Sequence, residues 1–382
     1  MRQAYRYKLY AADRNKRLDR QRIVACQIWN HSIALHRRYF RMFGKHLSQS
    51  RLKHRIALMR KHVRPEWQLL GSQSVQDVIE RIDRSYQRFF SWCKTRIGRR
   101  VAPPKFKKRV KYKSFTLKQA GWKLLDDNHI QIGRCSYKFH NSRPIEGQIK
   151  TVSMVRDAVG DYWIVFSVLN EAIGARQTVT GNTAGLDFGL TTFVTLSDKT
   201  TISAPQPLLK QIKQLRKSCG NVSRKKKGSN GRRRARLALA RLYRRIASMR
   251  RDWQLQTAAK LARTYDVLCI EDLSLQGMKA LWGRKVSDLA WGDFVSILKW
   301  QGLKYGCAIV EVGRYYPSSK ICSHCGHIHE GLGLKDRQWI SPSCGIQHDR
   351  DVNASVNIHH EGLRLFVAGK YEAGHRLREE AA

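Results

Sequence analysis

The sequence predicts a multidomain protein in which a helical part and a β-rich part precede an α/β part. Three observations support this fold class. Apolar residues recur at helical spacing in residues 11–98, short alternating segments follow Pro103–Pro104, and strands alternate with helices from Thr183 onward. With 382 residues, 42% of them hydrophobic, the chain is long enough to bury more than one core.

The helical part is predicted from two apolar series. The first runs from Ile23 to Ile33 and the second from Val75 to Phe90. The preceding segment, Tyr5–Tyr10, has the pattern of a strand that could join the β-rich part. Some aromatic side chains here could stack on nucleic-acid bases, although aromatics at helical spacing are more typical of a core. These residues are Trp29, Trp67, Tyr86 and Phe90.

The β-rich part is predicted to form a β-barrel or a curled sheet. It comprises residues 107–180, which contain several short strand patterns. Two of these, Thr151–Val155 and Tyr162–Leu169, flank the turn-rich segment Asp157–Asp161. This arrangement predicts a β-hairpin.

The α/β part begins with a β-like run from Leu186 to Leu196. Two short apolar strands follow at Asp266–Ile270 and Ala308–Val312, and helical stretches lie between the strands. Strands that alternate with helices in this way are typical of an α/β domain.

The charge of the chain indicates its class of partner. There are 73 Lys and Arg against 29 Asp and Glu, which gives a net charge of +44. Such a charge favours a large polyanion such as nucleic acid and excludes an acidic metabolite as the main partner. Neither the N-terminal segment nor any run of about 18 residues is apolar enough to predict secretion or membrane spanning. Nine cysteines, two of them at metal-type spacing, favour a reducing cytosolic compartment.

The most basic segment lies between the first two strands of the α/β part. No Asp or Glu occurs between Asp198 and Asp252, whereas Arg224–Arg251 contains 13 Lys or Arg. Apolar residues from Ala235 to Trp253 follow a helical stripe. Because no acids are interleaved to relieve repulsion, we expect phosphate contact rather than a merely solvated face. The candidate nucleic-acid-binding residues are Arg224, Lys225, Lys226, Lys227, Arg232, Arg233, Arg234, Arg241, Arg244 and Arg245.

Acidic residues at three distant places could form one metal site. Asp187 lies in a strand pattern, Glu271 ends an apolar strand, and Asp351 lies at the start of a helical run. Carboxylate oxygens suit Mg²⁺, and two metals can activate a water and stabilise the leaving oxygen of a phosphodiester. Taken singly, Asp187 could be a turn acid, Asp349 or Asp351 a helix N-cap, and Glu271 with Asp272 a surface pair. Their order on an α/β pattern favours a joint site.

Several segments together carry a more specific signal. They are Gly185–Gly189, Ser223–Ser229, Ile270–Leu273, Trp291–Phe294, Tyr316–Gly326 and Asp349–Ala354. In this combination and order the sequence resembles the TnpB family of transposon-encoded nucleases, relatives of the type V CRISPR effectors. The resemblance is close from about Thr183 to Ile358 and diffuse before that.

The resemblance implies a domain order. The α/β part would be a RuvC-like nuclease domain of RNase H fold with an inserted zinc-ribbon-like module, and the other parts would be wedge and recognition domains. The implied ranges are 1–10 and 107–180 for the β-barrel wedge, 11–106 for the helical recognition domain, 181–315 and 346–370 for the nuclease domain, 316–345 for the insert and 371–382 for a tail.

The resemblance also implies an activity. Asp187, Glu271 and Asp351 would be the catalytic acids that hold two Mg²⁺ ions, and Asp351 is preferred to Asp349 because the family's catalytic Asp precedes Asn by two residues, here Asn353. The partners would be a guide RNA from the transposon end and double-stranded target DNA bearing a short target-adjacent motif, in the cytoplasm of a bacterium or archaeon and associated with the nucleoid. Two alternatives are a guided repressor that does not cut and a transposase on the RNase H fold.

A cysteine pattern predicts a zinc site that lacks one ligand. Cys322-x2-Cys325 is followed, after fifteen residues, by Ser341-x2-Cys344, which is the spacing of a four-cysteine ribbon with serine at the third position. A neutral serine hydroxyl is a poor zinc ligand. Either a nearby histidine supplies the fourth donor, or the site is weakened or empty and packing on Trp339 maintains the loop. The candidate histidines are His324, His327, His329 and His348.

Overall fold

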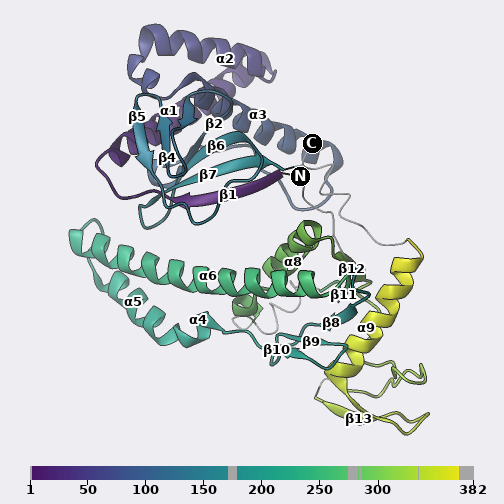
Figure 1. Cartoon of the computed structure of the whole chain (residues 1–382). Coiled ribbons are helices and arrows are strands. Elements are labelled where there is room, and N and C mark those ends of the chain that lie inside the picture. The colour runs from purple at the N-terminus through teal and green to yellow at the C-terminus, as the bar shows by residue number, and fades with distance from the viewer. Residues whose placement is uncertain (1, 171–178, 274–282, 284–285, 334, 370–382) are drawn as a thin grey trace. The chain divides into compact units, whose positions relative to one another are not determined.

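The computed structural model describes residues 2–170, 179–273, 283, 286–333 and 335–369 (Figure 1). The predicted tail, 371–382, lies outside the described residues. The chain divides into two compact units, Met1–Glu171 and Ala172–Ala382. No helix in the described part of the chain is both long and apolar enough to cross a membrane.

The strands of the first unit form two antiparallel sheets. They are β1 (Arg2–Lys8), β2 (Ser114–Leu117), β3 (Trp122–Leu124), β4 (His129–Ile132), β5 (Cys135–Lys138), β6 (Gln148–Arg156) and β7 (Tyr162–Leu169). Antiparallel pairing gives the orders β1-β7-β6-β2 and β3-β4-β5. An isolated bridge between Leu9 and Phe139 joins the two groups at the ends of β1 and β5. Among the described strands, no pairing of β2 with β3 closes the sheet into a barrel.

The β6–β7 hairpin confirms the hairpin predicted around Asp157–Asp161. The strands pair from Gln148 opposite Leu169 to Arg156 opposite Tyr162. In the turn, one carboxylate oxygen of Asp157 accepts three backbone N–H groups at 2.8 to 2.9 Å. Gly160 has a φ of 104°, which glycine adopts without strain.

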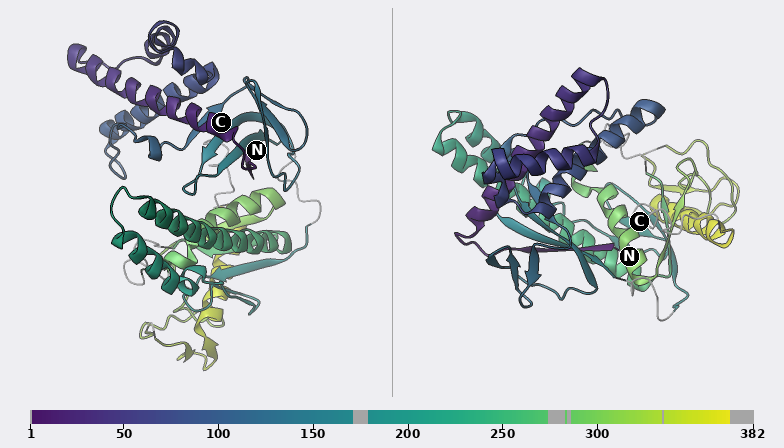
Figure 2. Two further views of the ribbon diagram at one scale, coloured as in Figure 1. Left: turned by 90° about the vertical axis from the view of Figure 1, so that its left-hand side faces the viewer. Right: turned by 90° about the horizontal axis from the view of Figure 1, so that it is seen from above.

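Helices gather on one side of the strands in the first unit (Figure 2). They are α1 (Asn15–Phe43), α2 (Gln49–Leu58), the π-helical turn η1 (Met59–Val63), the 3-10 turns η2 (Pro65–Leu69) and η3 (Arg109–Lys111), and α3 (Ser72–Thr95). Helices α1 and α3 pack against each other and against β2. One continuous apolar core joins the helices to the strands.

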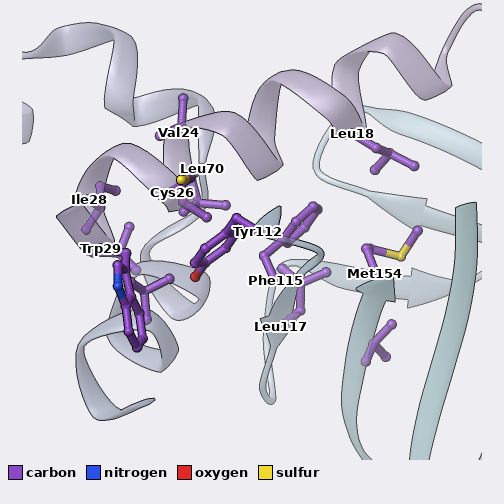
Figure 3. Packing of buried hydrophobic residues seen from close by; sticks show 14 of the residues in the cluster. Leu18, Val24, Cys26, Ile28, Trp29, Leu70, Tyr112, Phe115, Leu117 and Met154 are labelled. Carbon is purple, nitrogen blue, oxygen red and sulfur yellow. The ribbon is translucent and has the colours of Figure 1, made fainter. Parts of the chain in front are cut away.

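Aromatic side chains of the helical series belong to this core. Trp29, Trp67 and Tyr86 are buried, and Phe90 is partly buried against them, so the core interpretation is confirmed over base stacking for the three buried rings. Figure 3 shows Trp29 beside Tyr112, with ring centroids 6.2 Å apart. The Trp29 indole N–H also donates to a backbone carbonyl at 3.0 Å, which satisfies its buried polar atom.

The second unit contains a mixed five-stranded sheet. Its strands are β8 (Thr183–Asp187), β9 (Val194–Leu196), β10 (Thr201–Ile202), β11 (Val267–Glu271) and β12 (Ala308–Val312), in the order β10-β9-β8-β11-β12. The first three form an antiparallel meander, and β11 runs parallel to both β8 and β12. A separate ribbon pairs β13 (Gln338–Ile340) with β14 (Gln347–Asp349).

Helices cover both faces of this sheet. Helices α6 (Asn230–Thr264) and α8 (Trp291–Tyr305) lie on one face and α9 (Arg350–Val367) on the other, whereas α4 (Pro207–Lys210) and α5 (Ile212–Arg224) pack against α6. Leu186, Leu268 and Ile270 pack with α6 and α8, whereas Val267 and Cys269 pack with α9. The period of two along a strand therefore assigns alternate residues to opposite helix layers.

The predicted helical stripe from Ala235 to Trp253 lies within the single helix α6. Ile246 on this stripe is buried, but Met249 is 43% exposed. The N-terminal half of α6 forms a hairpin with α5, as Figure 1 shows. The stripe is therefore only partly covered, because α5, which starts at Ile212, is much shorter than α6, and the sheet is reached only by the C-terminal turns of α6.

Candidate active site

Two of the predicted acids end neighbouring parallel strands. Asp187 is the last residue of β8 and Glu271 the last of β11, and the register pairs Leu186 with Ile270 one residue earlier. Because strand residues alternate, Asp187 and Glu271 both project from the face that α9 covers. Adjacent strands lie about 4.8 Å apart, so the backbone alone brings the two carboxylates together.

The third acid lies in the first turn of α9. The helix starts at Arg350, two residues earlier than the predicted run from Val352, so Asp351 is inside the helix and not before it. Asp349 is the N-cap, and its side chain accepts the backbone N–H groups of Asp351 and Val352, both at 3.0 Å. The two aspartates therefore differ in role: Asp349 caps the helix, and Asp351 is available for other partners.

The three carboxylates line one cleft of about 490 Å³. Asp187, Glu271 and Asp351 share this cleft with Arg350 and with a loop that precedes the first cysteine pair, Tyr316–Lys320. Asp272, the neighbour of Glu271, is half exposed and pairs with Arg314 at 2.7 Å outside the cleft. The structure thus brings together the three predicted acids and leaves Asp349 and Asp272 with structural partners.

The electrostatics of the cleft favour a bound cation. Burial, followed by the carboxylates of Asp351 and Glu271, raises the pKa of Asp187 to about 7, although Arg350 partly opposes the shift. Burial and the adjacent Asp272 carboxylate also raise the pKa of Glu271. Like charges held this close are costly until a cation joins them, and carboxylate oxygens are the ligands that Mg²⁺ prefers.

Sequence reasoning assigned no role to two arginines at this site. The guanidinium of Arg350 is buried and donates to the carbonyls of Gly333 and Asp336 and to the Ser319 hydroxyl. Arg337 pairs with Asp351 at 3.2 Å. In the sequence, the position of Arg350 between Asp349 and Asp351 could have drawn attention to it. Its hydrogen-bond partners could not be predicted, because they lie 14 to 31 residues away in the chain.

The cysteine cluster is tied to the same helix. The Asn353 side chain donates to the carbonyl of Ile321 at 2.7 Å and accepts the N–H of Ser323 at 2.9 Å. These two hydrogen bonds hold the backbone on both sides of Cys322. Asn357, one turn later, donates to the Ile321 carbonyl as well. Helix α9 therefore holds both a cleft acid and the loop of the first cysteine pair.

Three of the four ribbon positions form a thiol cluster. The sulfur atoms of Cys322, Cys325 and Cys344 all lie within 4.8 Å of one another, and those of Cys322 and Cys344 are 3.7 Å apart. Tetrahedral zinc with bonds of about 2.3 Å requires sulfur atoms roughly 3.8 Å apart, so the cluster fits a zinc ion. A hydrogen bond from the His327 backbone, then the Ser341 hydroxyl, lower the pKa of the Cys325 thiol to about 6.

Two residues compete for the fourth position. The Ser341 hydroxyl lies 3.6 Å from the Cys325 sulfur. The His348 Nε2 atom lies 3.1 Å from the Cys322 sulfur. His324 and His327 are exposed, and the His329 ring rests against Trp339.

The candidate nucleic-acid-binding residues occupy the α5–α6 hairpin. Arg224 ends α5, and Lys225–Lys227 form the exposed connection to α6. Ser229 caps α6 by accepting the N–H of Arg232 at 3.1 Å. The remaining side chains lie on α6 and are exposed or partly exposed: Arg232, Arg233, Arg234, Arg241, Arg244 and Arg245.

Family models and a curated relative together match most of this chain. The family model described as "Probable transposase" matches residues 164–281, and the one described as "Cas12f1-like, TNB domain" matches 291–358. A protein of Streptomyces pristinaespiralis named "Putative RNA-guided DNA endonuclease" is 29% identical over 97% of this chain and 91% of its own length. The "TnpB-like protein L79" of Acanthamoeba polyphaga mimivirus is 27% identical over 61% of this chain and 47% of its own length.

The fold also matches a solved structure. The Cas12f1 protein in a cryo-EM structure titled as its complex with sgRNA and target DNA superposes with a TM-score of 0.56, over 91% of this chain and 83% of that chain. The sequence identity is 13%, so this likeness concerns the fold. The mixed α/β architecture described above is therefore shared with a compact effector.

Proposed function

Because this chain belongs to the TnpB family, we propose that it is an RNA-guided DNA endonuclease. It would cut double-stranded DNA complementary to a transposon-derived guide RNA, next to a short target-adjacent motif. The observation that carries the proposal is the convergence of Asp187, Glu271 and Asp351 on one cleft. The names of the relatives, as RNA-guided endonucleases, support the same activity.

The carboxylates are suited to hold two Mg²⁺ ions. When bound, the metals would supply an activated water and stabilise the departing 3′ oxygen of the phosphodiester. Asp187 and Glu271 fix two ligand groups on the rigid sheet, and Asp351 adds a third from the first turn of α9. Arg350 holds the loops that wall the cleft through its buried guanidinium.

We assign the parts of the chain accordingly. The order β10-β9-β8-β11-β12 with α9 over the acidic face supports a RuvC-like nuclease domain of RNase H fold. The assigned ranges are 181–315 and 346–370 for the nuclease domain, 316–345 for the zinc-ribbon-like insert, 1–10 and 107–180 for a wedge domain, and 11–106 for a recognition domain. The thiol cluster of Cys322, Cys325 and Cys344 would hold zinc in the insert.

The charge of the chain suits a guide RNA and target DNA as partners. An RNA–DNA heteroduplex is recognised through its shape and backbone in a positive channel, while base pairing supplies the sequence. The net charge of +44 and the exposed or partly exposed basic side chains of the α5–α6 hairpin between Arg224 and Arg251 provide such a surface. Affinity should therefore fall steeply with salt.

The decisive experiment compares Asp187→Ala with Asp272→Ala. Both remove an acid near the sheet edge, but Asp272 pairs with Arg314 outside the cleft. We expect guided plasmid cleavage with Mg²⁺ to be lost in Asp187→Ala and retained in Asp272→Ala, with the same amount of co-purifying RNA in both. Cleavage by Asp187→Ala at the wild-type rate would refute the site.

The same assay separates the alternative functions. A guided repressor would bind matched DNA but leave it intact both in Mg²⁺ and in EDTA. A transposase, which the description of one matching family suggests, would form strand-transfer products without any RNA. The proposed nuclease requires both Mg²⁺ and the guide.

A further inference from the structure

The three-thiol cluster is one donor short of a zinc site. The third ribbon position is Ser341, which is 1% exposed and whose hydroxyl lies 3.5 Å from the backbone nitrogen of Cys344. A neutral hydroxyl binds zinc weakly, whereas structural zinc is almost always held by four thiolate or imidazole donors. The site therefore needs a donor from outside the cysteine pattern.

The imidazole of His348, on the neighbouring strand β14, lies beside one of the three thiols. Its Nε2 atom lies 3.1 Å from the Cys322 sulfur, and its ring packs on Trp339 with centroids 4.9 Å apart. Trp339, only 6% exposed, is paired with His348 in the β13–β14 ribbon, so the imidazole is held at the edge of the cluster.

We propose that this chain binds zinc through Cys322, Cys325, Cys344 and the Nε2 atom of His348. Ser341 then remains a hydrogen-bonding residue of the second turn. This set has three thiolates and one imidazole, which is a common composition of structural zinc sites. The inference rests on the zinc site proposed above and is independent of guided cleavage.

The changed ligand would couple the zinc to the cleft. A donor at position 341 would come from the turn after β13, whereas His348 lies on β14, which continues directly into α9. His348 is adjacent to the helix cap Asp349 and three residues from Asp351. Because Asn353 already ties α9 to the loop of Cys322, zinc at this site fixes the start of α9 from two sides. Asp187 and Glu271 are held by the sheet and do not depend on it.

The test is zinc content and Co²⁺ absorption of the purified ribonucleoprotein. We expect one zinc per chain in the unmodified protein, and a Co²⁺ spectrum with the thiolate charge-transfer intensity of three sulfurs. His348→Ala should weaken zinc binding by at least about 100-fold, more than loss of a group that merely orients a ligand. His324→Ala, an exposed histidine in the same loop, should leave zinc binding unchanged.

A rescue variant guards against simple misfolding. Ser341→Cys combined with His348→Ala restores four good donors, so we expect full zinc and a Co²⁺ spectrum of four sulfurs. Equal zinc affinity in His348→Ala and the unmodified protein would overturn the proposal, as would an unmodified protein that gains zinc only with Ser341→Cys. So would a double variant that stays without zinc, since His348 would then matter for folding and not as a ligand.

Cleavage assays on the same variants test the coupling separately. We expect His348→Ala to cut slowly and the double variant to recover. Asp187→Ala should keep its zinc and lose cleavage, so failure of the zinc assignment and failure of the nuclease assignment give different results. Cleavage at the unmodified rate by zinc-free His348→Ala would refute the coupling.

Discussion

Glu80 of the first unit and Glu271 of the second lie in opposite electrostatic environments. In the first unit, Glu80 pairs with Lys118 at 2.6 Å and Lys53 at 3.3 Å. Burial alone would raise the pKa of Glu80, but the hydrogen bonds and charges of the two lysines outweigh it and lower the pKa. In the second unit, burial and the like charge of Asp272 raise the pKa of Glu271.

This contrast separates structural acids from a site. A carboxylate that is paired with cations stabilises the fold that holds it, whereas carboxylates gathered beside one another lower stability unless a ligand compensates. Groups whose pKa is raised by burial and by like charges, and which line a cleft, are candidates for chemistry. The proposed chemistry therefore belongs to the second unit, and each prediction below tests one side of the contrast.

The largest effect is expected at the start of α9. Asp351→Asn removes a proposed metal ligand, so guided cleavage should fall by at least about a thousandfold. Asp349→Asn keeps the helix cap, because asparagine caps as well as aspartate, and cleavage should stay within about threefold. Single-turnover rates with bound guide RNA measure both. If both variants lost the same amount of cleavage activity, Asp349 and Asp351 would contribute through the structure of the helix start and not through metal binding.

The next effect concerns a histidine in the first unit. Burial, then the charge of His46, lower the pKa of His36 to about 4, and His36 is 4% exposed. Its folded-state pKa lies below the ordinary value of 6.5, so stability is complete above pH 6.5 and is lost as the pH falls toward 4. The loss should reach about 3 kcal/mol, and denaturant unfolding between pH 7.5 and 4.5 measures it.

Two variants identify the source of that loss. His36→Phe retains a ring beside Tyr86, whose centroid is 4.6 Å away, and should reduce the pH dependence, leaving the smaller share of His31 and His46, whose pKa values burial also lowers. His54→Gln changes an exposed histidine and should leave it unaltered. An unchanged slope in His36→Phe would show that the acid sensitivity has another origin.

A smaller effect is expected at the contact between β8 and α9. A Cβ atom at Gly185 would lie 2.1 Å from the Ser355 carbonyl oxygen and 2.6 Å from the His359 nitrogen. Gly185→Ala should therefore displace α9, lower the free energy of unfolding by about 1–3 kcal/mol and slow cleavage. Gly220→Ala, in α5 with nothing within 4 Å, should be neutral or slightly stabilising. Equal melting temperatures in the two variants would contradict the close packing.

Local patterns were sufficient for the elements that carry the acids. The apolar run before Glu271 and the turn residues at Asp157–Asp161 predicted a strand and a hairpin, because strand period and turn chemistry depend on neighbouring residues. The alternation along β8 and β11 then determines which face Asp187 and Glu271 share. These features need no knowledge of distant contacts.

The remaining features depend on contacts between distant residues. The sequence shows Gly185 only as a neighbour of Asp187 in a strand pattern, whereas in the structure its small size permits the close approach of α9. The proposed choice of His348 among the four histidines depends on β14, which brings its Nε2 atom to 3.1 Å from the Cys322 sulfur. Likewise, Met249 fits the apolar stripe of α6 and is exposed, because the period of a helix does not specify where its packing partner ends.

The smallest effect tests the contrast between the two glutamates directly. The pKa of Glu80 is lowered, so its charge adds stability above pH 4.5, and Glu80→Gln should reduce the free energy of unfolding by about 1 kcal/mol at pH 8. The pKa of Glu271 is raised, so its charge costs stability at neutral pH, and Glu271→Gln should raise the unfolding free energy of metal-free protein by about 1 kcal/mol. Adding Mg²⁺ should stabilise the unmodified protein but not Glu271→Gln, and should leave the effect of Glu80→Gln unchanged. Calorimetry of the three proteins with and without EDTA measures all six states. If both substitutions shift stability in the same direction without metal, the Glu271 charge does not carry the cost that burial and the Asp272 carboxylate are expected to impose, and the contrast with Glu80 fails.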